Sequence, residues 1–453
     1  MKKILITLLA LFSGAIMVAQ TTVSGTVIDA NSEQPIPGVN IKVIGKSSGT
    51  STDFDGKFSF RVNEELPLSI EITFVGYTRK VIEVTEDDQD LKVSLSENAT
   101  SLDEVVVSAS RTPESVRESP VSIERMDIRD IQNTPAVDFY DGLENLKGVQ
   151  INTNSLTFKS VNTRGFATFA NARFVQLVDG MDSAAPALNF VMGNLTGMSE
   201  LDVHSVELLP GASSALYGAN AFNGILFMTS KNPFDYQGAS AYVKGGITSQ
   251  EAAGDNNYLD FGVRFAHAFS DKFAAKVSFS MLNGTDWIAD NYQDLNNPGR
   301  TRLDPGYDGL NVYGDEVATT LDFDLIAAGA GIALPPDFLG AARVSRTGYN
   351  DSDIMDYEAK SFKADAALHW RPTGGDLEVI LQGKVGVGST IYQGANRYSL
   401  DNFRMNMSKL EVKNKDFFVR IYRVEDNAGN SFDSRFAAIN INRRWKSDTQ
   451  WFT

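Results

Sequence analysis

The second half of the chain contains long stretches in which apolar and polar residues alternate. Residues 273–281 read Phe-Ala-Ala-Lys-Val-Ser-Phe-Ser-Met, and residues 260–269 and 362–370 follow the same pattern. A period of two places one class of side chain on each face of a β-strand. Each stretch is about ten residues long, the length at which a tilted strand crosses an outer membrane. We therefore expect residues 238–453 to form antiparallel strands with one apolar and one polar face.

Alternation alone does not say what covers the apolar face. A soluble β-sandwich would cover it with a second sheet, whereas a membrane barrel would leave it to lipid. Phe269, Trp287 and Trp370 lie at the ends of the expected strands. Aromatic rings concentrate at the lipid–water interface, so these positions favour the membrane interpretation.

The length of this region limits the barrel that it can build. Residues 238–453 allow roughly eight to ten strands when connections are included. Barrels that house a plug have about 22 strands. An unclosed sheet would leave an unpaired edge in lipid, which is not viable. We therefore expect this region to be the N-terminal part of a longer barrel, and the chain to be part of a longer protein.

The first twenty residues are typical of an export signal. Lys2 and Lys3 precede an apolar run over residues 4–18, which is shorter than the roughly twenty residues of a spanning helix. We expect cleavage near Ala19 or Gln20; a membrane anchor is the alternative.

Composition excludes several classes of protein. The chain has no cysteine, which excludes disulfides and thiolate metal sites. Its formal net charge is -16, which argues against nucleic acid as a partner. The three histidines, His204, His267 and His369, lie far apart within strand-like stretches. We expect them to be structural, and we expect no metal site, cofactor or catalytic group.

Residues 21–97 alternate in short stretches separated by turn residues such as Pro35-Ile36-Pro37-Gly38. This spacing predicts an antiparallel sandwich of about seven strands. The run GTVIDANSEQPIPGVNIKV and the later GTSTDFDGKF resemble the carboxypeptidase-regulatory-like domain. Asp53 and Asp55 are explained by a hairpin turn or, alternatively, by a calcium loop.

Residues 121–237, here called the plug region, combine helix-like and strand-like segments. Apolar residues at helical spacing predict a helix over 135–146. Residues 174–178, 205–209 and 224–229 are strand-like, so we expect an α+β domain. Residues 98–120, rich in Ser, Glu, Thr and Pro, are expected to be a linker.

Three segments of the plug region resemble the plug domain of TonB-dependent outer-membrane receptors. They are VNTRGF (161–166), FVQLVDGM (174–181) and VELLPGASSALYGANAFNGILFMTSK (206–231). Taken alone, the third segment is equally typical of a glycine-rich loop between strands. The residues that carry the resemblance are Arg164, Gly165, Phe166, Asp179, Gly180, Glu207, Gly211, Tyr217, Gly218 and Gly224.

The resemblance implies roles for two charged residues and for one segment of the linker. Arg164 and Glu207 would pair with barrel residues and hold the plug; a surface salt bridge is the alternative. A β-prone stretch ahead of the plug would be the TonB box, which adds a strand to the energy-coupling protein TonB. An extra strand of the sandwich is the alternative for this stretch. The box residues are Glu104, Val105, Val106, Val107, Ser108 and Ala109.

The whole pattern predicts a mainly β protein: signal peptide (1–20), β-sandwich (21–97), linker with TonB box (98–120), plug (121–237) and partial transmembrane antiparallel β-barrel (238–453). The resemblance implies active import across the cell outer membrane, without enzymatic chemistry. The partners would be TonB, outer-membrane lipid and a siderophore, vitamin, glycan or peptide ligand. A receptor for adhesion or signalling that does not transport is the alternative. Residues 286–360 are expected to be a long extracellular connection.

Overall fold

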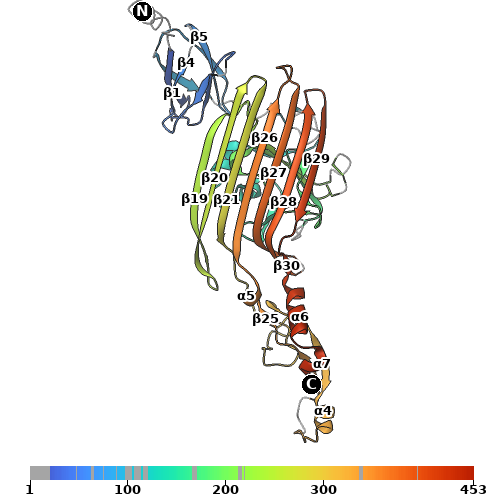
Figure 1. Cartoon of the computed structure of the whole chain (residues 1–453). Helices are drawn as coiled ribbons and strands as arrows, with labels where there is room; N and C mark the ends of the chain where they lie inside the picture. Colours follow the sequence, from blue (N-terminus) through green and yellow to red (C-terminus); the bar gives the residue numbers. More distant parts are fainter. Residues whose placement is uncertain are drawn as a thin grey trace, which may run out of the picture.

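A computed structural model describes residues 21–46, 48–62, 66–74, 76–87, 89–96, 105–106, 114–115, 121–165, 171–212, 217–218, 220–335, 340–394 and 396–452. A small sandwich lies beyond one end of a tall sheet, and short helices lie beyond the other end (Figure 1). Within the described ranges, no helix is both long and apolar enough to cross a membrane. The expected signal peptide falls outside these ranges.

The sandwich consists of two sheets around one apolar core. The described strands form a three-stranded sheet in the order β4-β1-β7 and a four-stranded sheet in the order β3-β2-β5-β6. Alternate residues such as Val27, Ile41 and Ile72 are fully buried between the sheets. The strands are β1 (Thr21–Asp29), β2 (Asn40–Val43), β3 (Gly49–Ser51), β4 (Lys57–Val62), β5 (Leu68–Thr73), β6 (Lys80–Val84) and β7 (Gln89–Leu95).

The expectation of a wholly antiparallel sandwich is wrong for one pair. β1 and β7 run parallel, in register from Val23 opposite Gln89 to Asp29 opposite Leu95. The chain reaches β7 by crossing from β6 in the other sheet, so no hairpin forces the two strands to run in opposite directions.

The plug region is built on a mixed five-stranded sheet in the order β10-β17-β18-β13-β14. β13 and β18 are parallel, and the other neighbours are antiparallel. The strands are β10 (Glu124–Met126), β11 (Val149–Thr153), β12 (Lys159–Thr163), β13 (Phe174–Val178), β14 (Met181–Asp182), β15 (Ala184–Ala185), β16 (Phe190–Val191), β17 (Val203–Pro210) and β18 (Gly224–Ser230).

The helix expected over 135–146 is shorter and of another type. The structure has the α-helix α2 (Ile128–Asn133), then a 3₁₀ helix η1 (Phe139–Asn145) and later a single 3₁₀ turn η2 (Glu200–Asp202). The Asp138 carboxylate accepts the Tyr140 N–H at 2.9 Å and so sets the start of η1 after Val137.

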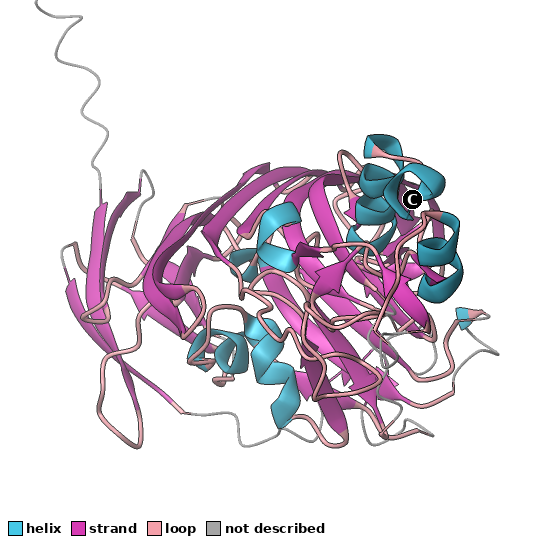
Figure 2. Ribbon diagram, turned by 90° about the horizontal axis from the view of Figure 1, so that it is seen from below, coloured by secondary structure: helices cyan, strands magenta, loops and turns pink. Residues whose placement is uncertain are grey.

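The second half of the chain forms an antiparallel sheet, here called the wall, whose long strands follow one another in chain order. The wall is curved, with the plug region on its concave side (Figure 2). The turns at 271–272, 371–377 and 414–417 lie at one end of the strands, and the 286–357 connection lies at the other end together with the turns at 251–253 and 394–396. The described strands are β19 (Gly238–Gln250), β20 (Gly254–Ser270), β21 (Phe273–Thr285), β26 (Glu358–Trp370), β27 (Glu378–Gln393), β28 (Arg397–Lys413), β29 (Phe418–Asn427) and the short β30 (Phe432–Asp433).

The two faces of the wall have unusual surroundings. Outward residues are apolar and uncovered; Val243, for example, is 76% exposed and Ile421 71% exposed. Inward residues such as Arg264, Lys276 and Gln382 are polar and buried. A soluble sandwich buries its apolar face and exposes its polar face, and the wall has the reverse arrangement, which is typical of membrane barrels.

The long connection is folded. Arg346 is buried, and its guanidinium donates to the carbonyl oxygens of Asn442 at 2.6 Å and Lys446 at 2.8 Å. The positive charge of Arg346 therefore lies at the carboxyl end of α6 (Ser434–Trp445), where the helix dipole makes a cation favourable. The elements of the connection are β22 (Val312–Tyr313), β23 (Ala318–Asp322), α4 (Phe323–Gly329), β24 (Ala341–Ser345), β25 (Tyr349–Asn350) and α5 (Asp351–Ile354). The helices α6 and α7 (Asp448–Phe452) follow β30.

Candidate functional site: contacts between the plug region and the wall

The turn after β13 inserts a carboxylate into the polar face of the wall. Asp179 Oδ2 lies 3.2 Å from the Lys384 ammonium and accepts the Gln382 amide at 2.8 Å. The Lys409 ammonium donates to the Asp179 carbonyl oxygen at 3.0 Å. Within the plug region, the Ser230 N–H donates to Asp179 Oδ1 at 2.8 Å. Two strands of the wall, β27 and β28, therefore bind one turn of the plug region.

The surroundings of Asp179 keep it ionised. Burial alone would raise the pKa of this carboxyl, but the ammonium groups of Lys384, Lys409 and Lys276 and the Ser230 N–H outweigh burial. Together they hold the pKa of Asp179 well below its usual value. The ion pairs with the wall therefore persist at neutral pH.

Gly180 lets a third strand approach the same turn. Its φ is +77°, in the left-handed region that favours glycine. A Cβ at this position would lie 1.9 Å from Nη1 of Arg420 on β29, so only glycine leaves room for this guanidinium. Arg420 donates to the Gly180 carbonyl oxygen at 3.1 Å and pairs with Glu411. The Asp-Gly dipeptide is thus a docking point for β27, β28 and β29.

A second carboxylate anchors the other side of the plug region. Asp202, at the end of η2, pairs with Arg264 Nε at 2.7 Å and with Lys276 Nζ at 2.8 Å. The three side chains are 2%, 3% and 1% exposed, respectively. Removal of one member of such a buried cluster leaves uncompensated charge and costs several kcal/mol. β20 and β21 are therefore bound to η2 by a water-poor ionic contact.

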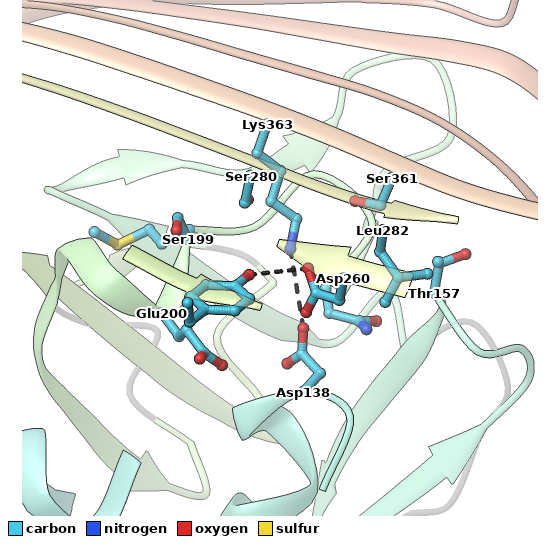
Figure 3. Close-up of a pocket in the computed structure, with 12 residues that line it drawn as sticks. Asp138, Thr157, Ser199, Glu200, Asp260, Ser280, Leu282, Ser361 and Lys363 are labelled. Atoms are coloured by element: carbon cyan, nitrogen blue, oxygen red, sulfur yellow. Dashed lines mark hydrogen bonds and ion pairs between the residues drawn. The ribbon is translucent and has the colours of Figure 1, made fainter. Parts of the chain in front are cut away.

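A small cavity separates the same two bodies beside this cluster (Figure 3). It measures about 20 Å³, enough for about one water molecule. Lys363 Nζ lies 3.9 Å from Asp138 across it, and the Tyr242 hydroxyl donates to Asp260 at 3.0 Å. The contact between Lys363 and Asp138 is longer and more exposed than the ion pairs of Asp202, so this part of the interface is held less tightly.

The opposite end of the plug region is held by hydrogen bonds. Asp286, just beyond β21, accepts the Ser155 hydroxyl at 2.6 Å and the Leu156 N–H at 2.8 Å. Ser361 on β26 donates to the Leu195 carbonyl oxygen at 3.0 Å. The plug region is therefore fixed to the wall near both ends of the strands.

The predicted charged residues Arg164 and Glu207 lie within the plug region. The Arg164 guanidinium packs against Gly211, where a Cβ would lie 2.3 Å from Nη1. Glu207 is 4% exposed and lies on β17, opposite Arg125 and Phe227 in register. The ion pairs with the wall described above come from Asp138, Asp179 and Asp202.

The remaining motif residues shape the plug region itself. Gly165, Gly211, Gly218 and Gly224 all have positive φ. The Tyr217 ring packs edge-on against Phe227, with ring centroids 5.1 Å apart. Phe166 lies outside the described residues.

Two residues of the expected TonB box lie within the described part of the chain. Val105 and Val106 form β8 (Val105–Val106), which pairs antiparallel with β9 (Glu114–Ser115). Within the described residues, this pair is a separate two-stranded sheet and not a strand of the sandwich. Glu104, Val107, Ser108 and Ala109 fall outside the described residues.

Sequence reasoning missed Asp202 and its partners. The basic residues were visible on the polar face of the expected strands, because Arg264, Lys276 and Lys363 each occupy an alternating position. A membrane barrel has few reasons to carry buried lysine and arginine unless carboxylates face them. These inward basic residues could have indicated that carboxylates of the plug region face them.

Comparisons with known families identify the two N-terminal parts of the chain. The CarboxypepD_reg-like domain matches residues 23–107 and the TonB-dependent Receptor Plug Domain matches residues 115–225. The first match extends over Val105 and Val106, so it includes part of the expected TonB box.

Relatives cover about half of the chain. TonB-dependent receptor P39 of Formosa agariphila is 31% identical over 229 residues, 47% of this chain and 20% of that protein. TonB-dependent receptor SusC of Bacteroides thetaiotaomicron is 26% identical over 278 residues, 59% of this chain and 27% of that protein. The matched segments thus span about a quarter or less of these relatives.

Solved structures of similar shape include the siderophore receptor PirA from Pseudomonas aeruginosa. It has a TM-score of 0.39 at 14% identity, over 67% of this chain and 40% of that one. The copper transporter OprC has a TM-score of 0.37 at 15% identity, over 66% and 36%. Residues 23–107 are therefore a CarboxypepD_reg-like domain, and residues 115–225 are a TonB-dependent receptor plug domain.

Proposed function

We propose that this chain is the N-terminal part of an outer-membrane receptor that imports a ligand by TonB-dependent transport. One observation carries the proposal. The plug domain packs on the polar, inward face of the wall, while the apolar face of the wall stays uncovered. A sheet of this kind is suited to contact lipid outside and a removable domain inside.

In this proposal the ligand binds at the end of the wall that carries the folded 286–357 connection. TonB then binds the segment 104–109 at the other end by strand addition. The pull shifts the plug and breaks part of its contacts with the wall. The wetter contacts around Asp138 and Lys363 suit such a change better than the dry Asp202 cluster. The ligand is transported and is not chemically changed.

The segment 104–109 gives a direct test. Val106→Pro removes a backbone donor and fixes φ, so it prevents ladder pairing, whereas Val106→Ala leaves the backbone free. Ligand binding to whole cells and energised uptake of the same ligand are measured for the full-length receptor and both variants. We expect normal binding throughout and loss of uptake in the proline variant alone.

Each other result contradicts part of the proposal. If the proline variant imports ligand normally, 104–109 is not the TonB box. If it also loses binding, the segment belongs to a folded domain that shapes the receptor. If wild-type uptake survives collapse of the proton-motive force, the protein is not energised through TonB.

A further inference from the structure

An arginine of the plug contacts two aromatic rings of the sandwich. Arg129, on α2, places its guanidinium carbon 4.7 Å from the centroid of the Tyr77 ring and 5.9 Å from that of Phe74. The two rings belong to the sandwich and lie 5.7 Å apart. A guanidinium within about 6 Å of a ring face is attracted to its π-electrons. We call this set of three side chains the Arg129 clamp.

The sandwich presents a preformed surface to the guanidinium. Gly76 lies between the two rings in sequence, with a φ of +79°, and a Cβ there would lie 2.9 Å from the guanidinium. The Tyr77 hydroxyl donates to Asp29 at 2.7 Å, and Asp29 also accepts the Ser32 N–H at 2.7 Å. The orientation of the Tyr77 ring is therefore fixed from inside the sandwich before Arg129 binds.

The plug holds its side of the clamp equally firmly. Asp127 and Asp130 form a capping box at the start of α2, and the Asp127 carboxylate accepts the Arg129 N–H at 2.7 Å. Ile128 and Ile131 bury the same helix in the plug. Arg129 therefore links two bodies whose local structures are each well supported.

One end of the linker lies beside this clamp, and the other end meets the plug region at Val121, eight residues ahead of Arg129 in the sequence. The Thr78 N–H donates to the Ser96 carbonyl oxygen at 3.0 Å, so the chain leaves the sandwich beside Tyr77. On the plug side, β10 and α2 follow Val121 directly. The proposed TonB box, 104–109, thus lies in a segment whose two ends are attached to bodies joined by the clamp.

We propose that the Arg129 clamp is a mechanical brake on the plug, and this inference rests on the proposed function. While the clamp is closed, a pull on 104–109 loads the sandwich as well as the plug. The sandwich-side arm, 97–103, has seven residues and the plug-side arm, 110–120, has eleven. Fully extended they reach about 25 and 40 Å, so the sandwich arm becomes taut first. The clamp must then open before the full pull reaches the plug.

The β8–β9 ladder does not alter this order. It contains two residue pairs, Val105 with Ser115 and Val106 with Glu114. An isolated two-stranded hairpin is marginally stable at best. The ladder therefore opens early under load, and the plug-side arm regains its full length.

A reversible cross-link tests the brake in the full-length receptor. Thr78 lies beside Tyr77, and Gln132 lies one turn from Arg129 on α2. The 453 residues contain no cysteine, so Thr78→Cys with Gln132→Cys gives a defined pair for a linker that contains a reducible disulfide. We expect cross-linked cells to bind ligand normally, to lose energised uptake and to regain it after reduction. Normal uptake in the cross-linked state would overturn the brake.

Release of the clamp should have the opposite effect. Arg129→Ala removes the clamp, so less of the force that TonB exerts acts on the sandwich. Uptake should therefore persist at uncoupler concentrations that stop the wild type. Arg79→Ala is the matched control, since Arg79 is an exposed sandwich residue paired with Glu71. An unchanged uncoupler titration for Arg129→Ala, or an equal shift for Arg79→Ala, contradicts the proposal.

The two hypotheses fail separately. If Val106→Pro abolishes uptake but the cross-link has no effect, the TonB box stands and the brake is wrong. If Val106→Pro imports normally, the proposed function itself is wrong, whatever the cross-link does.

Discussion

The sandwich and the wall use the same sequence pattern and place it in opposite ways. In the sandwich, alternate residues such as Val27 and Ile41 are buried against a second sheet, and the polar residues face outward. In the wall, the buried residues include charged ones such as Arg264 and Lys276 beside apolar ones such as Met405, and the outward apolar residues are uncovered. Strand geometry sets the period of two. Whether the apolar or the polar side chains are buried depends on whether a second sheet or the plug packs against the strand.

The difference lies in the type of interaction that holds each body together. The sandwich is stabilised by removal of apolar surface from water, which needs no specific partners. The inner face of the wall contacts the plug through apolar residues of β27 and β28 and also through ion pairs that each need a particular carboxylate. The sandwich core should therefore tolerate changes of shape but not charge, and the wall–plug interface should tolerate neither the loss nor the displacement of a charge.

The largest effect should come from a charge in the sandwich core. Ile72→Asp buries an unpaired carboxylate at a fully buried position of β5, which we expect to cost at least about 4 kcal/mol and to unfold the sandwich. Ser69→Asp, on the exposed face of the same strand, is the control. Limited proteolysis of the receptor in membranes should show rapid loss of the N-terminal domain in Ile72→Asp alone.

A nearly equal effect should follow from removal of a charge at the wall. Asp202→Ala leaves Arg264 and Lys276 buried without their carboxylate, at a cost of about 3–5 kcal/mol. Glu200→Ala removes a partly exposed pair with Lys244 and should cost about 1 kcal/mol or less. Hydrogen exchange of β17 should accelerate strongly in the first variant. Similar exchange in both variants would mean that the buried cluster is not a special anchor.

The outward face of the wall should respond according to depth in the membrane. Val277 is 49% exposed near the middle of β21, and a lysine there should cost about 2–4 kcal/mol in a bilayer. The same change at Thr285, at the end of the strand, should cost about 0–1 kcal/mol. Urea titration of the full-length receptor folded into vesicles measures both. Equal costs would indicate that water, and not lipid, covers this face.

The smallest effect should come from the Asp179–Gly180 turn. Gly180→Ala places a side chain at positive φ, which costs about 1–2 kcal/mol, and also displaces the Arg420 guanidinium. Gly148→Ala has a similar φ, +73°, with open space around the new Cβ, so it isolates the backbone cost. We expect Gly180→Ala to release the plug from the wall at a lower urea concentration than Gly148→Ala. Identical curves would show that the approach of Arg420 contributes nothing to docking.

Sequence patterns predicted the strands better than their partners. The alternation over 273–281 and the strand-like segments at 205–209 and 224–229 all correspond to observed strands. The helix expected over 135–146 became a shorter 3₁₀ helix, because the Asp138 cap fixes its start. The partner of Asp202 could not be predicted, because Arg264 lies 62 residues away and meets it only through the fold.

The 286–357 connection shows a second reason for incomplete prediction. Its many Asp and Gly residues are typical of turns, and nothing in its local sequence indicates a buried arginine. Arg346 is buried because α6, almost a hundred residues later, supplies carbonyl oxygens at its carboxyl end. The fold of this connection depends on contacts between two segments far apart in the sequence. Neither segment alone indicates that Arg346 is buried.

The parallel pairing of β1 and β7 affects how the sandwich domain can be joined to the domain that follows it. Because these strands run side by side in one direction, the chain enters the sandwich at one pole, at Thr21, and leaves it at the other, after Leu95. A domain whose two termini lie at opposite ends can be joined to the N-terminus of another domain without the chain having to turn back. Recombination could therefore place such a sandwich ahead of an existing plug, or remove it, while the plug and the wall keep the geometry that they already have.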